Sequence, residues 1–255
     1  MRGGHVRRTI RAVLFDVDDT LIDYAGAEYD GIVSYLRSLG VEVDINVAAA
    51  RFGELQEFHF KRFLAGRTDY VGQARSLAKD MIAWMKVRST GDPYRWFLGY
   101  RERYEASLRL FPDVLDGLAS LGNVPLGIVS NSDTAFSRVK LQRVGLLSRF
   151  NCVVGVDAAG VSKPHPRIFH TGCAALGYPP AVTAYVGDNK LGDAVAADAA
   201  GLLGVWVNRS GAGGDGLTDL RQLAATLELD SGPAATPPQR QGRPDWRKPL
   251  APHSV

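Results

Sequence analysis

The chain has 255 residues, of which 45% are hydrophobic and 22% are charged, and its formal net charge is +3. This length is enough for one domain with an insertion or for two modest domains, and the composition is that of an ordinary globular protein. No apolar run approaches the roughly 18 residues that a membrane span needs, and no secretory signal segment follows the basic start of the chain. We therefore expect a cytoplasmic protein without a membrane partner.

The positive charge is concentrated at the two ends of the chain. Residues 1–11 contribute +4 and residues 231–255 contribute +3, which leaves −4 for the rest. A nucleic-acid-binding surface would have to lie in these ends, whose composition is typical of flexible segments, so we expect no nucleic-acid partner. We expect a flexible basic N-terminus over residues 1–10 and a disordered, Pro-rich tail over residues 230–255.

The first predicted element is a buried strand, residues 11–15, that ends in the acidic stretch DVDDT. Helical spacing of apolar side chains follows over residues 24–108. Gly40 is placed to end the first helix of this block, and Asp92 and Pro93 are placed to begin the last one. We therefore expect a helical domain of residues 24–108, inserted after the first strand.

Beyond residue 112 the pattern changes to short apolar segments that alternate with amphipathic helices. The predicted strands are residues 125–129, 152–156, 183–186 and 203–207. The predicted helices are residues 113–121, 134–144, 166–176, 192–200 and 217–228. This alternation is typical of an α/β fold. We expect a Rossmann-like three-layer core with a central parallel sheet, built from residues 11–23 and 109–229.

Polar side chains follow the predicted strands at the points where the strands end. They are Asp16, Asp18, Thr20, Ser130, Asn131, Lys163, Asp188 and Asp193. In an open parallel sheet, ligands bind beyond the carboxyl ends of the strands, so we expect these side chains to form one site. Carboxylates without histidine or thiolate partners favour a hard cation such as Mg²⁺, and a hydroxyl, an amide and a lysine are donors for a phosphate.

Asp16 and Asp18 are two carboxylates that could divide the work of phosphoryl transfer between them. A carboxylate beside a metal ion can act as a nucleophile and form an acyl phosphate. A second carboxylate two residues further on can protonate the leaving alcohol and later deprotonate water. The residues therefore indicate a phosphate-processing site.

Four segments together resemble the four motifs of the haloacid dehalogenase (HAD) superfamily. They are DVDDT at 16–20, Ser130 in VSN, Lys163 in SKPHP, and GDNKLGD at 187–193. The segments occur in the family's order, and each follows a predicted strand. The helical block after the first strand is similar to the cap domain of the capped hydrolases of this superfamily.

The resemblance implies a role for each residue of the first motif. Asp16 is expected to be the nucleophile and a metal ligand. Asp18 is expected to be the general acid and base, and to offer its backbone carbonyl group to the metal. Thr20 is expected to hold the turn and orient Asp18.

The resemblance also assigns the other three motifs. Ser130 and Asn131 are expected to contact the phosphoryl group, and Lys163 is expected to hold both that group and Asp16. Asp188 is expected to coordinate Mg²⁺ directly, and Asp193 either coordinates the ion or supports its ligands.

Position 18 separates branches of the superfamily. In the dehalogenase branch the first motif resembles DxY, because a halide needs no proton to leave. Phosphatases carry DxD at the same place. Asp18 therefore indicates phosphoester hydrolysis. Asp19 is interpreted as a turn residue, because the family pattern leaves its position variable, and His165 as a loop or helix N-cap residue.

We expect a Mg²⁺-dependent phosphatase that hydrolyses a small phosphomonoester, such as a sugar phosphate or a nucleotide, through an aspartyl-phosphate intermediate. A cap that closes over the site favours a small metabolite as the partner over a phosphoprotein. A phosphotransferase or mutase is the alternative enzyme, and a non-catalytic metabolite-binding or scaffold protein is the alternative of another class. The chain is expected to be a monomer or a homodimer.

Overall fold

The computed structural model describes residues 9–87 and 91–230, which form two compact units. One unit comprises the described parts of Met1–Ile22 and Leu110–Val255, and the other comprises those of Asp23–Arg109. Most of the two segments expected to be flexible, residues 1–8 and 231–255, lies outside the described residues.

Two residues that we expected in the flexible ends belong instead to the folded core unit. Ile10 is fully buried, and its N–H group donates to the carbonyl group of Glu228 at 2.7 Å. The N–H group of Asp230 donates to the carbonyl group of Ile10 at 2.9 Å. The two ends of this unit are therefore joined by backbone hydrogen bonds.

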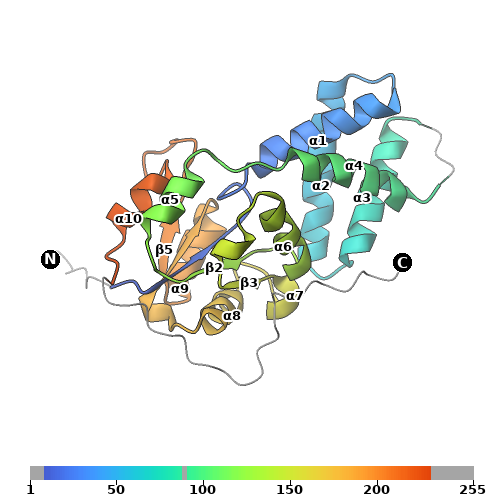
Figure 1. The fold of residues 1–255 in the computed structure, drawn as a ribbon. Helices are drawn as coiled ribbons and strands as arrows, with labels where there is room; N and C mark the ends of the chain where they lie inside the picture. Colours follow the sequence, from blue (N-terminus) through green and yellow to red (C-terminus); the bar gives the residue numbers. More distant parts are fainter. Residues whose placement is uncertain (1–8, 88–90, 231–255) are drawn as a thin grey trace. The chain divides into compact units, whose positions relative to one another are not determined.

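In the unit Asp23–Arg109, the regular structure of the described residues, 23–87 and 91–109, is helical (Figure 1). Its helices are α1 (Tyr24–Leu39), α2 (Ile45–Leu64), α3 (Tyr70–Trp84) and α4 (Pro93–Ser107). Each begins after an aspartate whose side chain accepts a hydrogen bond from a backbone N–H group of the first turn, namely Asp23, Asp44, Asp69 and Asp92. Gly40 ends α1 in the left-handed conformation, with φ of 62°, as its position in the sequence predicts.

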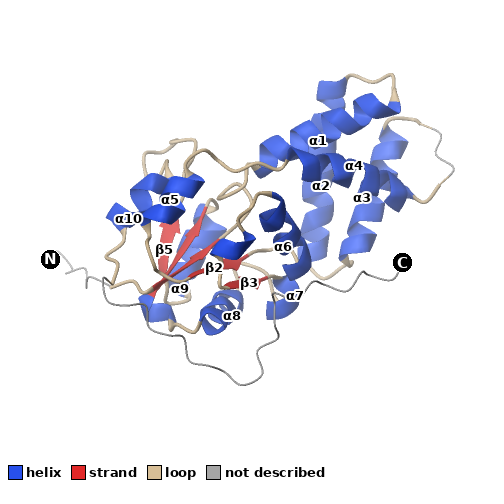
Figure 2. Cartoon of the chain, viewed as in Figure 1, coloured by secondary structure: helices blue, strands red, loops and turns tan. Residues whose placement is uncertain are grey.

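The core unit contains a five-stranded sheet in which all neighbouring strands are parallel (Figure 2). The strands are β1 (Ala12–Phe15), β2 (Leu126–Val129), β3 (Cys152–Val154), β4 (Thr183–Gly187) and β5 (Leu203–Trp206). Their order across the sheet is β3-β2-β1-β4-β5, so β1 is central and is buried on both faces. Phe15 pairs with Ile128 on one side and with Val186 on the other.

Helices cover both faces of the sheet, which confirms the predicted Rossmann-like fold. The helices of this unit are α5 (Val114–Ser120), α6 (Thr134–Arg143), α7 (Val156–Ala159), α8 (Pro166–Leu176), α9 (Ala196–Ala199) and α10 (Leu223–Thr226). Residues of α8 and α9 share a buried apolar cluster with Leu14 and Tyr185, so these helices cover one face. Right-handed crossovers place α5 and α6 on the other face, where α5 contacts α10. None of the helices in the described ranges has the length and apolar character that crossing a bilayer requires.

The core unit also contains short 3₁₀ and π-helical turns, two of which replace parts of predicted helices. The three-residue 3₁₀ turns are η1 (Leu147–Arg149), η2 (Pro180–Val182) and η4 (Leu220–Gln222), and a π-helix, η3, spans Lys190–Val195. The predicted helix 192–200 is therefore a π-helix followed by α9, and the predicted helix 217–228 is reduced to η4 and α10. Strand β3 ends at Val154, two residues before its predicted end, since α7 begins at Val156. Gly155 lies between them, and the backbone of residues 132–134 lies within 2.6 Å of where a Cβ atom would stand.

Candidate active site

The carboxyl ends of three adjacent strands meet at the centre of the sheet. Strand β1 leads into Asp16, and its neighbours β2 and β4 lead into Ser130 and Asp188. After β1 the chain forms β2 and β3 on one side of β1, and it then crosses to form β4 and β5 on the other side of β1. This reversal is the point at which ligands bind in open parallel sheets.

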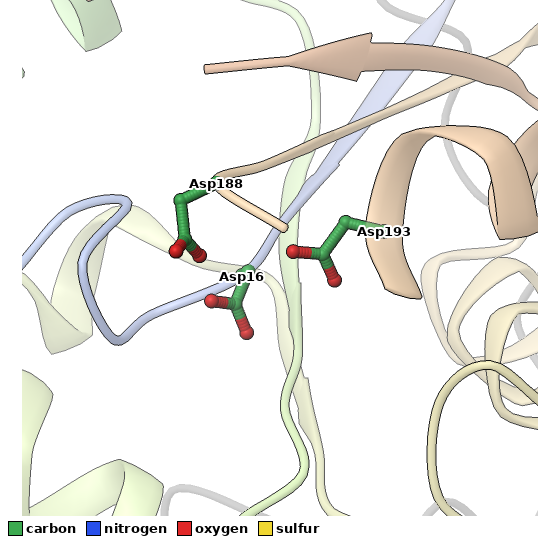
Figure 3. Close-up of side chains that lie close together, drawn as sticks. All are labelled: Asp16, Asp188 and Asp193. Atoms are coloured by element: carbon green, nitrogen blue, oxygen red, sulfur yellow. The ribbon is translucent and has the colours of Figure 1, made fainter. Parts of the chain in front are cut away.

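Three of the predicted carboxylates form one group, in which Asp16, Asp188 and Asp193 each offer an oxygen atom within 4.8 Å of the others. Figure 3 shows the three carboxyl groups converging from β1, from the end of β4 and from the π-helix η3. Asp16 and Asp193 are buried, and Asp188 is partly buried. A Cβ atom at Gly187 would lie 2.4 Å from the Asp193 carboxyl group, so this close approach requires glycine.

The ammonium group of Lys163 lies beside these carboxylates and is itself buried. It donates hydrogen bonds to Asp16 Oδ1 at 2.6 Å, to Asp193 Oδ1 at 2.7 Å and to the hydroxyl oxygen of Tyr185 at 2.9 Å. Each of its three hydrogens thus has an acceptor. Burial acts to lower the pKa of Lys163, but Asp16 and the other groups near it raise that pKa well above its usual value.

The cluster of Asp16, Asp188, Asp193 and Lys163 has more negative than positive groups, since it holds three carboxyl groups and one ammonium group. Burial raises the pKa of Asp16 to about 8; Lys163 opposes the shift, and Asp193 and Asp188 add to it. Burial and the neighbouring Asp193 raise the pKa of Asp188 to about 6. A divalent cation would balance this charge, and an all-oxygen donor set fits a hard cation such as Mg²⁺.

Thr20 connects two of the carboxylates. Its hydroxyl oxygen lies 3.2 Å from Asp188 Oδ1 and 3.4 Å from Asp16 Oδ2, and it accepts a hydrogen bond from the N–H group of Asp188 at 2.9 Å. We expected Thr20 to orient Asp18, but the contacts of its side chain are with Asp16 and Asp188. Between Asp18 and Thr20 the chain turns at Asp19, whose φ of 55° is left-handed.

The residues after β2 contribute a hydroxyl group and a positioning amide. Ser130 is buried, and its hydroxyl oxygen accepts a hydrogen bond from the N–H group of Ser132 at 3.1 Å. The side chain of Asn131 accepts from the backbone N–H group of Lys163 at 2.7 Å and donates to the Lys163 carbonyl group at 3.3 Å. The Asn131 amide therefore holds the segment that carries Lys163.

Asp18 lies outside the group of three carboxylates. Both of its side-chain oxygens accept hydrogen bonds from Lys140, at 2.6 and 2.5 Å. His165 is the N-cap of α8, where its ring nitrogen Nδ1 accepts a hydrogen bond from the N–H group of Arg167, as the sequence predicts.

Sequence reasoning missed three residues that hold the site together, namely Lys140, Tyr185 and Arg209. Tyr185 stands in an apolar strand and looked like a core residue, yet its hydroxyl group donates to the Val129 carbonyl group at 2.9 Å and accepts from Lys163. A signal existed for Lys140, because position 140 shares the inward face of α6 with Ser137 and Leu141, where a lysine requires a partner.

Arg209 stabilises the turn within the first motif. Its guanidinium group donates to the backbone carbonyl groups of Asp19 at 3.2 Å and Thr20 at 2.5 Å, and to both carboxylate oxygens of Asp113 at 3.0 and 3.1 Å. It also lies 3.7 Å above the ring of Phe111. The left-handed turn at Asp19 is therefore held from a segment that is distant in sequence.

We expect Arg209→Met to destabilise the protein and to slow its reaction. Removing one partner of a largely buried ion pair costs about 3–5 kcal/mol, and a small displacement of Thr20 costs about 10- to 100-fold in rate. Urea unfolding and kcat/KM on an aryl phosphate measure the two effects. Arg221→Met is the control, since Arg221 is exposed and pairs with Asp219 within its own turn. Equal behaviour of the two variants would contradict the role of Arg209.

Comparisons with known proteins show the family to which the chain belongs. A family model described as haloacid dehalogenase-like hydrolase matches residues 10–201. A phosphoglycolate phosphatase from Photorhabdus laumondii is 29% identical over 204 residues, which cover 77% of this chain and 79% of that protein. A glyceraldehyde 3-phosphate phosphatase from Methanopyrus kandleri is 29% identical over 214 residues, which cover 78% of this chain and 84% of that protein.

A solved structure of similar fold is that of the HAD-hydrolase YfnB from Bacillus subtilis, described as bound to magnesium. The two structures match with a TM-score of 0.73 and a sequence identity of 20%, and the match covers 86% of this chain and 99% of the YfnB chain. The chain thus combines a Rossmann-like α/β fold with a group of three carboxylates at the carboxyl edge of its parallel sheet. The chain belongs to the haloacid dehalogenase-like hydrolase family, which confirms the resemblance found in its motifs.

Proposed function

We propose that this chain is a Mg²⁺-dependent phosphatase that hydrolyses small phosphomonoesters through a phosphorylated Asp16. One observation carries the proposal: Asp16 lies against Lys163 within a group of three carboxylates, and a further carboxylate, Asp18, follows two residues later. The family match and the phosphatases among the relatives support a hydrolase of phosphoric monoesters.

Asp16 and Asp18 divide the chemistry between them. In the first step, a carboxylate oxygen of Asp16 bonds to phosphorus while the ester P–O bond breaks, and Asp18 gives its proton to the leaving oxygen. In the second step, water bonds to phosphorus while the bond to Asp16 breaks, and Asp18 takes the proton of the water. Asp16 is then restored as a carboxylate.

The remaining residues of the site bind and orient. Lys163 balances the charge of Asp16, and the Ser130 hydroxyl group and the N–H groups near it are donors for phosphoryl oxygens. Asp16, Asp188 and Asp193, with the Asp18 carbonyl group, are the residues that would hold Mg²⁺. When bound, the ion supplies positive charge that favours the carboxylate form of Asp16 and offsets the charge of a phosphate.

We assign the choice of substrate to the helical unit Asp23–Arg109, which interrupts the core unit in sequence in the manner of a cap. The relatives named above are phosphatases of phosphoglycolate and of glyceraldehyde 3-phosphate. A short phosphorylated metabolite is therefore the proposed substrate class.

A metabolite screen tests the proposed function. The panel contains 2-phosphoglycolate, glyceraldehyde 3-phosphate, sugar phosphates and nucleoside monophosphates, each with Mg²⁺ and with EDTA. We expect release of inorganic phosphate from at least one short metabolite with Mg²⁺, a fall to background with EDTA, and recovery when excess Mg²⁺ is added.

The acceptor of the phosphoryl group distinguishes a phosphatase from a phosphotransferase or mutase. We expect one inorganic phosphate for each alcohol released, even when a second alcohol is present at high concentration. If more alcohol than inorganic phosphate is released, the phosphoryl group is transferred to the second alcohol. If no phosphate is turned over with Mg²⁺, the enzymatic role is contradicted.

A further inference from the structure

Lys140 is a buried cation that none of the proposed steps uses. It lies on α6, which begins after Asp133, whose side chain accepts from the N–H group of Phe136 at 2.7 Å. The buried residues of this helix are Ser137, Lys140 and Leu141, which share one helical face. Lysine is almost never fully buried without a partner, so its position indicates a specific contact.

That contact is with Asp18. The Nζ atom of Lys140 lies 2.6 Å from Oδ1 and 2.5 Å from Oδ2 of Asp18, and 3.3 Å from the hydroxyl oxygen of Ser132. The Lys140 side chain is 1% exposed, whereas that of Asp18 is 27% exposed. The carboxyl group is therefore held from the protein side while part of it remains open to solvent.

The surroundings of Lys140 restrict it to this contact. The ring of Phe136, one turn earlier on α6, lies 5.0 Å from its Nζ atom. Strands β1 and β2 are neighbours in the sheet, so the loop after β1, which carries Asp18, and the helix after β2, which carries Lys140, are brought together by the fold. Without Asp18 the buried ammonium group of Lys140 would lose the carboxylate that compensates its charge, which is costly, so the two side chains are held together.

We propose that Lys140 is a positioning residue, which fixes the carboxyl group of Asp18 for proton transfer to and from the substrate. The proposal rests on the phosphatase function proposed above. When Asp18 is a carboxylate, Lys140 balances its charge. When Asp18 carries the proton, one oxygen still accepts from Lys140 while the other holds the hydrogen that passes to the leaving oxygen. Lys140 keeps its own protons throughout.

The dependence of the rate on the leaving group separates this role from a structural one. An alkyl phosphate needs a proton on its leaving oxygen, whereas p-nitrophenol leaves readily as its anion. General acid catalysis is worth about 10²–10⁴-fold where it is needed. A misplaced Asp18 should therefore slow an alkyl phosphate much more than p-nitrophenyl phosphate, while general damage to the fold should slow both equally.

The experiment compares kcat/KM for 2-phosphoglycolate and p-nitrophenyl phosphate in Lys140→Met, Asp18→Asn and the double variant. This parameter reports the steps up to phosphorylation of Asp16, and the ratio of the two substrates does not depend on the fraction of folded protein. We expect the alkyl-to-aryl ratio to fall by at least about 10-fold in Lys140→Met and also in Asp18→Asn. Adding Lys140→Met to Asp18→Asn should then change the ratio less than 3-fold, because the two residues act as a unit.

Arg143→Met is the matched control, since Arg143 is an exposed cation on the same helix, and its ratio should equal that of the unmodified enzyme. An unchanged ratio in Lys140→Met, or additive losses in the double variant, would overturn the positioning role. If the unmodified enzyme hydrolyses no phosphate of the metabolite panel, the proposed phosphatase function fails, and the role of Lys140 fails with it; if another alkyl phosphate of the panel is the substrate, it replaces 2-phosphoglycolate in the ratio. Thermal unfolding of the same variants separately tests the Lys140–Asp18 contact, whose removal should give non-additive changes in Tm.

Discussion

Asp16→Asn should abolish turnover of p-nitrophenyl phosphate, with a loss of at least about 10⁴-fold, as is typical when a nucleophile is removed. The asparagine side chain keeps the shape of the carboxyl group but has no oxygen that can form a stable bond to phosphorus. The fold should survive, because Asp16 is one of three carboxylates whose charges repel one another. Circular dichroism and a thermal unfolding curve check the fold, and initial rates measure the loss.

A neighbouring acid provides the control for this experiment. Asp19 follows the same strand, but its left-handed backbone conformation, with φ of 55°, is one that asparagine also tolerates. Asp19→Asn should therefore retain turnover within about 3-fold. Rapid acid quenching followed by intact mass measurement should show one added phosphoryl group in the unmodified enzyme and none in Asp16→Asn. Turnover by Asp16→Asn at the unmodified rate would remove Asp16 from the nucleophile role.

Mg²⁺ should stabilise the protein more at pH 8.5 than at pH 6, because protons and the cation compete for the same carboxylates. The pKa of Asp16 is raised to about 8 in the folded protein, above its ordinary value of 3.8. Between these values the folded state holds a proton that the unfolded state has lost, so the contribution of Asp16 to stability falls as the pH rises towards 8. Asp188, whose pKa is raised to about 6, acts in the same direction at lower pH.

The measurement is Tm in EDTA and in Mg²⁺ across this pH range. At 100 times its dissociation constant, a bound ion adds about 2.7 kcal/mol, or about 5–10 °C in Tm for a protein of this size. We expect a shift of this order at pH 8.5, a smaller one at pH 6, and a decline of Tm with rising pH in EDTA. Asp16→Asn should weaken both effects, since it removes the titrating group. A Mg²⁺ shift that is equal at both pH values would contradict the proposed competition.

The amino-acid sequence by itself determined the architecture of this protein. Short apolar segments alternating with helices predicted the parallel sheet, and Asp92 with Pro93 predicted the start of α4. These features depend on near neighbours in the chain, where periodicity and capping act directly. The residues of the acidic cluster were also named from sequence, because each follows a strand and parallel strands end at one edge.

Only the tertiary structure decided how those residues are held. Asp16 lies 147 positions from Lys163, and Lys140 lies 122 positions from Asp18, so no local pattern specifies these contacts. Arg209 resembles an ordinary loop cation in the sequence, and the position of Lys140 on the inward face of α6 predicts a partner without naming it. Packing alone brings Lys140 to Asp18 and Arg209 to the turn at Asp19. The sequence determines which groups reach the sheet edge, whereas the charge balance and orientation of each group depend on contacts that form only when distant segments pack together.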